Sequence, residues 1–322
     1  MIARRPRGFL VALAVVVLLF STVASSWAAR KSCGPGCPNN PDDLINNAES
    51  GDVITPLYEQ DFGRNTNAAV LKVDAEIEGG WSHPGFNCGG SATGSFPDRD
   101  AMLAAGFSYD TNNRSELRGF GARVVGLDSA VKNFQIRDMI LAQFGSFTGN
   151  GGVLGQSAAG LTGTSVTLAN TTVRADPSGS VALTGNGGGL YLELDAGSTL
   201  RITGSSFTKN TATNGGAIQV RLRGNSTLFI AESAFQDNDA TVNGGAIRVL
   251  LESGSVVIAD TQFSGNTAIG AGRDIRIEGP TGASASQRVY LVRNTYSGAN
   301  SVSVTGNITV YTNQVALPLV RR

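Results

Sequence analysis

Histidine is nearly absent from this chain of 322 residues, and charged residues make up only 16% of it. The one histidine, His83, is flanked by turn-forming residues, where a lone histidine is more often an ordinary loop residue than a catalytic base. No nucleophile motif, phosphate-binding loop or zinc-ligand spacing accompanies it. The sequence therefore gives no support to a histidine-based triad or to a zinc site.

Long apolar runs are also scarce, because the segment 9–20 is the one stretch of that kind. Three arginines precede it, and small residues follow it up to the expected cleavage site after residue 28 or 29, a pattern typical of a signal peptide. The run is shorter than the roughly 20 apolar residues that a membrane helix needs. We therefore expect residues 1–28 to be removed on export and the mature chain to contain no membrane span.

Neither sign of charge dominates the chain, which has 25 basic and 25 acidic residues. Removal of the three arginines in residues 1–28 leaves 22 basic groups against 25 acidic groups, a net charge of −3. That balance gives no reason to expect a nucleic acid as the partner.

Cysteine is rare as well, and the three residues present are Cys33, Cys37 and Cys88. Thiols of exported proteins usually pair, so we expect one disulfide and one remaining thiol. A bond between Cys33 and Cys37 would close the tight loop CGPGC, whereas a bond from either to Cys88 would tie the N-terminal tail to the body. The sequence leaves the pairing open.

Glycine, in contrast, is abundant, with 42 residues. Glycine inside a helix costs about 1 kcal/mol relative to alanine, so this composition favours turn-rich β structure. Hydrophobic residues make up 41% of the chain and recur at regular positions, which argues against a disordered glycine-rich linker.

The strongest feature of the sequence is an internal repeat of about 28 residues. The word NGGGLYLEL at 186–194 returns as NGGAIQVRL at 214–222 and as NGGAIRVLL at 243–251. Apolar residues alternate with polar ones within and between these words, which predicts short strands with one buried face. Glycine and asparagine cluster between the strands and predict turns there.

A second word, FxxN, follows the first in each repeat, and LVRN continues the series. Strands this short cannot bury their own apolar face, so the repeats must stack with like positions ~4.8 Å apart. We therefore expect a ladder of aromatic rings in the core and a ladder of asparagine amides in a turn. The residues expected in these ladders are Phe207, Asn210, Phe235, Asn238, Phe263, Asn266 and Asn294.

The two words together resemble a known family. GGAI at 215–218 and 244–247, alternating with FxxN, resembles the repeat of chlamydial-type polymorphic outer-membrane proteins and related bacterial β-helix proteins. The resemblance covers roughly residues 186–294 and implies a right-handed parallel β-helix, export and a surface or adhesive role. Many relatives end in a barrel, but residues 301–322 are too few for eight strands of ~10 residues, so we expect this chain to lack it.

These patterns predict one β-helix domain over residues 41–316, with coils of about 28 residues. A short helix in residues 41–54 would cap the N-terminal end, after a cysteine-containing tail at 29–40. Residues 82–118 interrupt the strand pattern and are expected to form a large loop that leaves the coil. The strands expected after residue 301 would close the other end before a short tail at 317–322.

Acidic residues at the repeat spacing suggest an enzymatic alternative. Glu232, Asp260 and Arg288 follow one another at steps of 28 residues. Stacking would place the two carboxylates ~5 Å apart, as in a retaining glycosidase or on one side of a calcium site. Arg288 would then stabilise a carbanion or bind a uronate, in a polysaccharide lyase or glycoside hydrolase. A ladder of surface charges with little energetic consequence is the simpler interpretation.

A second candidate site lies on the other strand of the repeat. Alternation turns Tyr191, Arg248 and Arg276 outward in one column and Arg221 in the next. Their arginines would bind an extended anionic glycan, although any solvated sheet face shows mixed charge.

The sequence thus predicts a secreted or cell-envelope protein, extracellular or at the periplasmic or outer-membrane surface. We expect a non-catalytic binding or adhesion module for a polysaccharide or another cell-surface component, with no cofactor. The alternatives are a carbohydrate-active enzyme, with calcium if it is a lyase, and a purely structural envelope component.

Overall fold

The computed structural model of the chain describes residues 30–33, 41–56, 69–82, 95–96, 98–112, 114–120, 122–156, 160–175, 185–282, 287–296 and 298–312. The expected signal peptide lies outside these residues, as do Cys37, Cys88 and His83. The disulfide pairing therefore stays a prediction.

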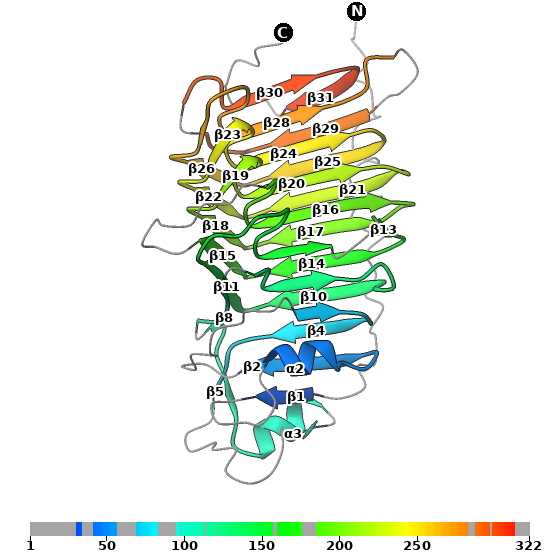
Figure 1. The fold of residues 1–322 in the computed structure, drawn as a ribbon, viewed down its shortest axis with the longest axis vertical. Helices are drawn as coiled ribbons and strands as arrows, with labels where there is room; N and C mark the ends of the chain where they lie inside the picture. Colours follow the sequence, from blue (N-terminus) through cyan, green and yellow to red (C-terminus); the bar gives the residue numbers. More distant parts are fainter. Residues whose placement is uncertain are drawn as a thin grey trace, which may run out of the picture.

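The described residues form coils stacked along one axis, and equivalent strands of successive coils lie side by side in the sheets (Figure 1). In the coil that starts at residue 218, the chain passes in turn through β20 Ile218–Leu222, β21 Ser226–Ala231, β22 Ala234–Gln236 and β23 Asp239–Asn243. The next strand, β24 Ile247–Leu251, lies in register beside β20. The strands of successive coils pair in parallel. The parallel β-helix expected from the repeat is confirmed.

We number the sheets by their place in the coil. Sheet 1 contains β1 Arg30–Cys33, β2 Asp52–Pro56, β4 Ala75–Glu78, β6 Ser95–Phe96, β10 Asn133–Arg137, β14 Ser165–Ala169, β17 Thr199–Thr203, β21 Ser226–Ala231, β25 Gly254–Ala259, β29 Gln287–Val292 and β31 Ile308–Thr312. Sheet 2 contains β3 Ala69–Leu71, β9 Val125–Leu127, β12 Leu154–Gln156, β13 Leu161–Thr162, β16 Leu190–Asp195, β20 Ile218–Leu222, β24 Ile247–Leu251, β28 Ile275–Glu278 and β30 Val302–Thr305.

Two smaller sheets complete the coil. Sheet 3 contains β8 Ser115–Phe120, β11 Met139–Phe144, β15 Thr172–Ala175, β18 Ser206–Thr208, β22 Ala234–Gln236 and β26 Gln262–Ser264. Sheet 4 contains β19 Thr211–Asn214, β23 Asp239–Asn243 and β27 Thr267–Ala268. A separate ribbon pairs β5 Trp81–Ser82 with β7 Ser108–Tyr109, and the helices are α2 Pro41–Asn46 and α3 Arg99–Ala104.

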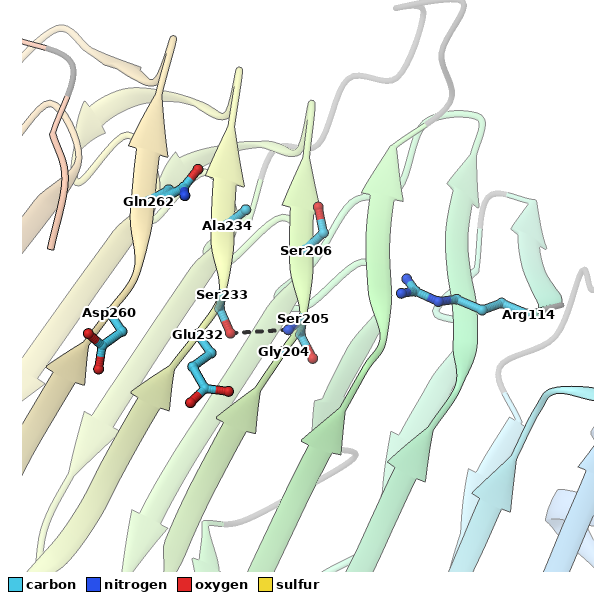
Figure 2. A pocket seen from close by; sticks show the side chains of 9 residues that line it. All are labelled: Arg114, Gly204, Ser205, Ser206, Glu232, Ser233, Ala234, Asp260 and Gln262. Carbon is cyan, nitrogen blue, oxygen red and sulfur yellow. Dashed lines mark hydrogen bonds between the residues drawn. The ribbon is translucent and has the colours of Figure 1, made fainter. Parts of the chain in front are cut away.

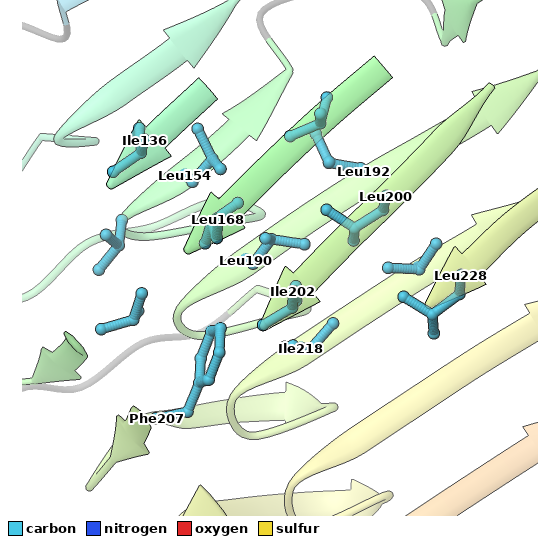
Figure 3. Close-up of a cluster of buried hydrophobic side chains, with 14 of the residues drawn as sticks. Ile136, Leu154, Leu168, Leu190, Leu192, Leu200, Ile202, Phe207, Ile218 and Leu228 are labelled. Atoms are coloured by element: carbon cyan, nitrogen blue, oxygen red, sulfur yellow. The ribbon is translucent and has the colours of Figure 1, made fainter. Parts of the chain in front are cut away.

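The core follows from the alternation seen in the sequence. Leu200, Leu228 and Val256 pair in register along sheet 1, and all three are fully buried. Leucine and isoleucine side chains from sheets 1 and 2 fill the space between the strands (Figure 3). Each coil contributes a few apolar side chains, and stacking turns them into one continuous core.

An aromatic ladder runs through this core. The rings of Phe207 and Phe235 stack with centroids 4.9 Å apart, and those of Phe235 and Phe263 with centroids 5.1 Å apart. Tyr296 continues the ladder, with its ring 5.4 Å from that of Phe263. Leu291, the first residue of the word LVRN, lies instead in sheet 1, where it pairs with Ile258.

Asparagine side chains form a second buried ladder beside the rings. The side chain of Asn238 accepts from the Nδ2 of Asn210 at 3.0 Å, and that of Asn266 accepts from the Nδ2 of Asn238 at 2.9 Å. Asn294 does not join this ladder, contrary to the prediction, since its Oδ1 accepts from the backbone of Thr261. The buried carboxyl of Asp274 accepts from Asn266 at 2.9 Å instead and ends the ladder.

The paired glycines of the first word have a backbone role. Gly215 and Gly244 have φ values of 59° and 65°, in the left-handed region that favours glycine. A Cβ on Gly216 would lie 2.2 Å from the carbonyl oxygen of Gly245 in the next coil. One glycine therefore makes the turn, and the other allows the coils to approach.

The N-terminal end of the core is covered by a short helix, as expected. Leu44 and Ile45 of α2 are buried in the main core cluster. Beyond α2, sheet 1 continues through β1, which pairs with β2, so the segment 29–40 is not merely a tail.

Residues 82–118, expected as one loop, contain a small packed unit. Trp81, Met102 and Phe107 form their own buried cluster, and the ring of Tyr109 lies 5.0 Å from that of Trp81. Trp81 also donates a 3.0 Å hydrogen bond to Glu78, which fixes the unit to the coil. The expected boundary at residue 118 is wrong, because β8 pairs with β11 in sheet 3.

Replacement of Asn238 by alanine tests the asparagine ladder. The change removes the buried acceptor of the backbone N–H of Asn210 and the side-chain donor to the carbonyl of Phe207, and it breaks both amide–amide bonds of the ladder. We therefore expect the free energy of unfolding to fall by about 2–3 kcal/mol. Chemical denaturation measures this loss. The matched control is Gln236→Ala, an exposed position two residues away in the same coil, and an equal loss in both variants would contradict the ladder.

Asp274 predicts a pH dependence of stability. Burial raises its pKa above the ordinary 3.8, so the carboxyl binds a proton more tightly in the folded chain than in the unfolded chain. Its contribution to stability is therefore present below pH 3.8 and is lost as the pH rises through the raised pKa. Asp274→Asn keeps an acceptor for Asn266 and should reduce this loss in unfolding experiments across that pH range. If the free energy of unfolding of Asp274→Asn depended on pH in the same way as that of the unchanged chain, the assigned role of Asp274 would be contradicted.

Candidate groove at the corner of the coil

An open groove lies where the chain turns from sheet 1 into sheet 3 (Figure 2). Its volume is about 330 Å³, and its lining comes from successive coils at the same corner. The lining residues are Arg114, Gly204, Ser205, Ser206, Glu232, Ser233, Ala234, Asp260 and Gln262. Both carboxylates proposed from the sequence therefore line this groove.

The corner owes its shape to one left-handed residue in each coil. Gly204, Glu232, Asp260 and Arg293 occupy this position with φ between 49° and 55°. Such a φ costs a residue with a side chain roughly 1 kcal/mol, and it ends the strand abruptly. The side chains at this position therefore leave the turn outward, beside the groove.

Hydroxyl groups hold the corners of successive coils together. The residue after the left-handed position is a serine in two coils, and the backbone of Ser205 donates to the Oγ of Ser233 at 3.2 Å (Figure 2). The same Oγ donates to the carbonyl of Ala231 at 2.8 Å. Because these hydroxyl groups form hydrogen bonds that stabilise the corner, we interpret them as structural groups that line the groove and not as nucleophiles.

Glu232 and Asp260 lie on consecutive coils and on the same side of the turn. The backbone of Glu232 donates to Ala259 at 3.2 Å, which sets the two corners in register. Both side chains are exposed. Glu232 has no ion-pair partner among the residues that the structure describes, whereas Asp260 is held by Arg293.

The pair of Asp260 and Arg293 is bidentate. The Nε of Arg293 donates to Oδ1 at 2.6 Å, and its Nη2 donates to Oδ2 at 2.5 Å. These hydrogen bonds lower the pKa of Asp260 below its ordinary value and keep it charged. A carboxylate in this state cannot serve as a proton donor near neutral pH.

Arg288 does not lie beside Asp260, contrary to the stacking expected from the sequence. It pairs with Ser255 at the opposite end of the strand, because Val256 lies beside Val289, a step of 33 residues and not 28. The added residues fall between β28 and β29. Arg293 therefore takes the position that the 28-residue step assigned to Arg288.

Arg114 lies over the opposite end of the groove. Its Nη1 donates to the hydroxyl of Thr172 at 2.7 Å, and its Nη2 is hydrogen-bonded to Asn170. No carboxylate of a described residue forms an ion pair with it. Positive charge therefore stands at one end and the carboxylates of Glu232 and Asp260 at the other, with small and polar side chains between them.

The outer face of sheet 2 brings the predicted glycan-binding residues together, but they are engaged with one another. Arg248 donates to both oxygens of Glu278 at 2.8 and 3.3 Å, and Arg276 lies 3.4 Å from the same carboxylate. Arg221 is paired with Glu252. Tyr191 donates to Glu193 at 2.5 Å. Acidic side chains on or beside this face therefore neutralise the positive charge of its arginines.

Sequence reasoning missed Arg293, Arg114 and Gln262 as groove residues. Arg293 belongs to the word LVRN, and its place follows once β29 is aligned through its apolar residues with β25. Arg114 comes from the segment that precedes β8, and no repeat pattern marks it. Gln262 comes one residue before Phe263, the first residue of an FxxN word. The alternation of buried and exposed positions predicts that its side chain points outward.

The described residues contain no group of three or more metal-ligating side chains. None of their helices has the length and apolar character of a membrane span.

Fold and repeat together define a parallel β-helix repeat protein. Residues 204–221, from the corner of the groove to β20, match the family model of the Chlamydia polymorphic membrane protein (Chlamydia_PMP) repeat. This finding confirms the resemblance in the part of the chain that it covers, and it associates the repeat with a surface and outer-membrane family. No curated protein and no solved structure matches the chain significantly.

Replacement of Arg293 by glutamine tests the geometry of the corner. The loss of its hydrogen bonds should raise the pKa of Asp260 toward 3.8, as followed by the carboxyl carbon in an NMR titration. Arg288→Gln is the matched control and should leave that titration unchanged. A raised pKa of Asp260 in Arg288→Gln, with no change in Arg293→Gln, would support the register expected from the sequence and contradict the structure.

Proposed function

We propose that the protein is a non-catalytic binding module of the cell envelope or surface, and that its ligand is an extended glycan held in the corner groove. The observation that carries the proposal is the groove itself, whose lining residues other than Arg114 come from the same corner of successive coils. The match to a repeat of surface proteins supports the location.

The groove suits a polymer with many hydroxyl groups. Its lining offers acceptors on Glu232, a donor and an acceptor on Gln262 and donors on Arg114. Successive coils repeat about every 4.8 Å, so a chain laid along the axis meets a new set of polar groups at each step. Because the groove is open to solvent, a long polymer can lie along it without threading one of its ends through the protein.

Binding explains the charges better than catalysis does. A retaining glycosidase needs one carboxyl as the acid and a second as the nucleophile. Both oxygens of Asp260 are occupied by Arg293, and both carboxyls lie exposed to water. The lyase alternative placed Arg288 beside these acids, and the structure puts that residue elsewhere.

Incubation of the chain from Arg30 onward with neutral and acidic polysaccharides tests the proposal. We expect retention on at least one polymer without release of new chain ends. Glu232→Gln should weaken that retention about tenfold, the effect of one lost hydrogen bond from a charged group. Arg248→Gln, on the face of sheet 2, is the control and should bind normally.

The other outcomes separate the alternatives. New chain ends that disappear in Glu232→Gln or Asp260→Asn would identify an enzyme, and a requirement for added calcium would favour a lyase. Loss of retention in Arg248→Gln alone would place the ligand on sheet 2. No retention on any polymer would contradict glycan binding and favour a structural role.

A further inference from the structure

Gly204 leaves a gap in the row of corner side chains that borders the groove. Strand register places Asn170, Gly204 and Glu232 beside one another in successive coils, all with φ between 47° and 55°. Apart from its neighbours in the chain, a Cβ on Gly204 would have its nearest contact 4.0 Å away, at the backbone of Asn170. Coils repeat about every 4.8 Å, so the corners of Asn170 and Glu232 lie roughly 10 Å apart with open space between them.

Arg114 and Glu232 give the two sides of this gap opposite charge (Figure 2). The guanidinium of Arg114 is held by the side-chain oxygens of Thr172 and Asn170. Because both partners are neutral, these contacts leave the positive charge uncompensated. They use one N–H group each, and the other donors of the guanidinium remain for a ligand. On the other side, the exposed carboxylate of Glu232 can accept hydrogen bonds.

A buried network fixes the position of Arg114. The Nδ2 of Asn170 donates to the buried carboxyl of Asp138 at 2.6 Å and to the carbonyl of Thr111 at 3.3 Å. Because both are acceptors, the Oδ1 of Asn170 must face Arg114. Asp138 also accepts from the hydroxyl of Tyr109, and burial together with this hydrogen bond raises the pKa of Tyr109. The hydroxyl therefore keeps its proton, and the arginine is held in place before a ligand arrives.

We propose that the gap over Gly204 binds an acidic sugar of the glycan, with its carboxylate on Arg114 and a hydroxyl group on Glu232. The inference rests on the proposed function and adds the chemical class of the ligand. Arginine pairs with a planar carboxylate through two parallel hydrogen bonds, each roughly twice as strong as one between neutral groups. The opposite charges also fix the direction of the sugar, because Glu232 repels its carboxylate. Asn170 and Asp138 are positioning residues for Arg114.

Retention of hyaluronan and polygalacturonate tests the proposal, with each polymer beside its carboxyl-reduced form. Reduction replaces the carboxylate by an alcohol and leaves the sugar backbone unchanged. We expect the protein to retain at least one acidic polymer about tenfold more tightly than its reduced form, and the difference to shrink with added salt. Equal retention of the two forms, or retention of neutral polysaccharides alone, would overturn the inference and leave the proposed function standing. No retention of any polymer would overturn both.

Variants of Arg114 locate the acidic group. Arg114→Gln keeps an N–H donor without the charge, so the preference for the acidic form should disappear. Arg114→Lys keeps the charge and should restore part of the preference. Arg174→Gln is the matched control, because Arg174 follows Thr172 on the same strand, pairs with Glu116 and lies outside the groove lining. It should keep the full preference, and a preference that survives in Arg114→Gln would overturn the assignment.

Gly204→Asn fills the gap itself. Asparagine tolerates the left-handed turn, as Asn170 does in the preceding coil. We expect retention of the acidic polymer to fall about tenfold or more, with little change in Tm. Normal retention in this variant would place the acidic sugar elsewhere and overturn the proposal.

Discussion

The parallel register between successive coils is the constraint on which the rest of the structure depends. Backbone hydrogen bonds fix each residue beside its equivalent in the next coil, as Leu228 lies beside Val256. Each side chain therefore lies beside the equivalent side chain of the next coil. Aromatic rings stack on rings and amides bond to amides, so a feature tolerated once can be repeated along the axis.

The same register decides where polar groups can serve a ligand. Inward positions are filled by the core, and the outward arginines of sheet 2 are offset by acidic neighbours. At the corner between sheets 1 and 3, the left-handed turn directs Glu232 and Asp260 out of the coil. The corner is thus the place where successive coils leave adjacent polar groups beside an open groove.

Sequence reasoning recovered the features that obey the 28-residue step. The rings of Phe207, Phe235 and Phe263 and the amides of Asn210, Asn238 and Asn266 stack as the repeat predicts. The sequence-based alignment failed where the spacing between equivalent residues of successive coils changes from 28 to 33 residues. A constant spacing of 28 then assigns a residue to the wrong neighbour in the next coil. Asn294 and Arg288 were misplaced for that one reason, and Tyr296 was missed.

Other features had no signal in the repeat. The acidic partners of Arg221 and Arg248 come from adjacent coils, and only the folded register shows that the charges meet. The small unit built on Trp81 depends on an antiparallel pairing between segments that have no repeat. Such contacts follow from tertiary packing, which local patterns do not encode.

The most direct test of this account is whether Asp260 lies beside Arg293 or beside Arg288. Cysteines at 260 and 293, in a chain whose native cysteines are replaced by serine, should form a disulfide under mild oxidation, since residues on adjacent coils lie within the reach of such a bond. Cysteines at 260 and 288 should remain reduced. A disulfide between 260 and 288, with none between 260 and 293, would contradict the register and the groove built on it.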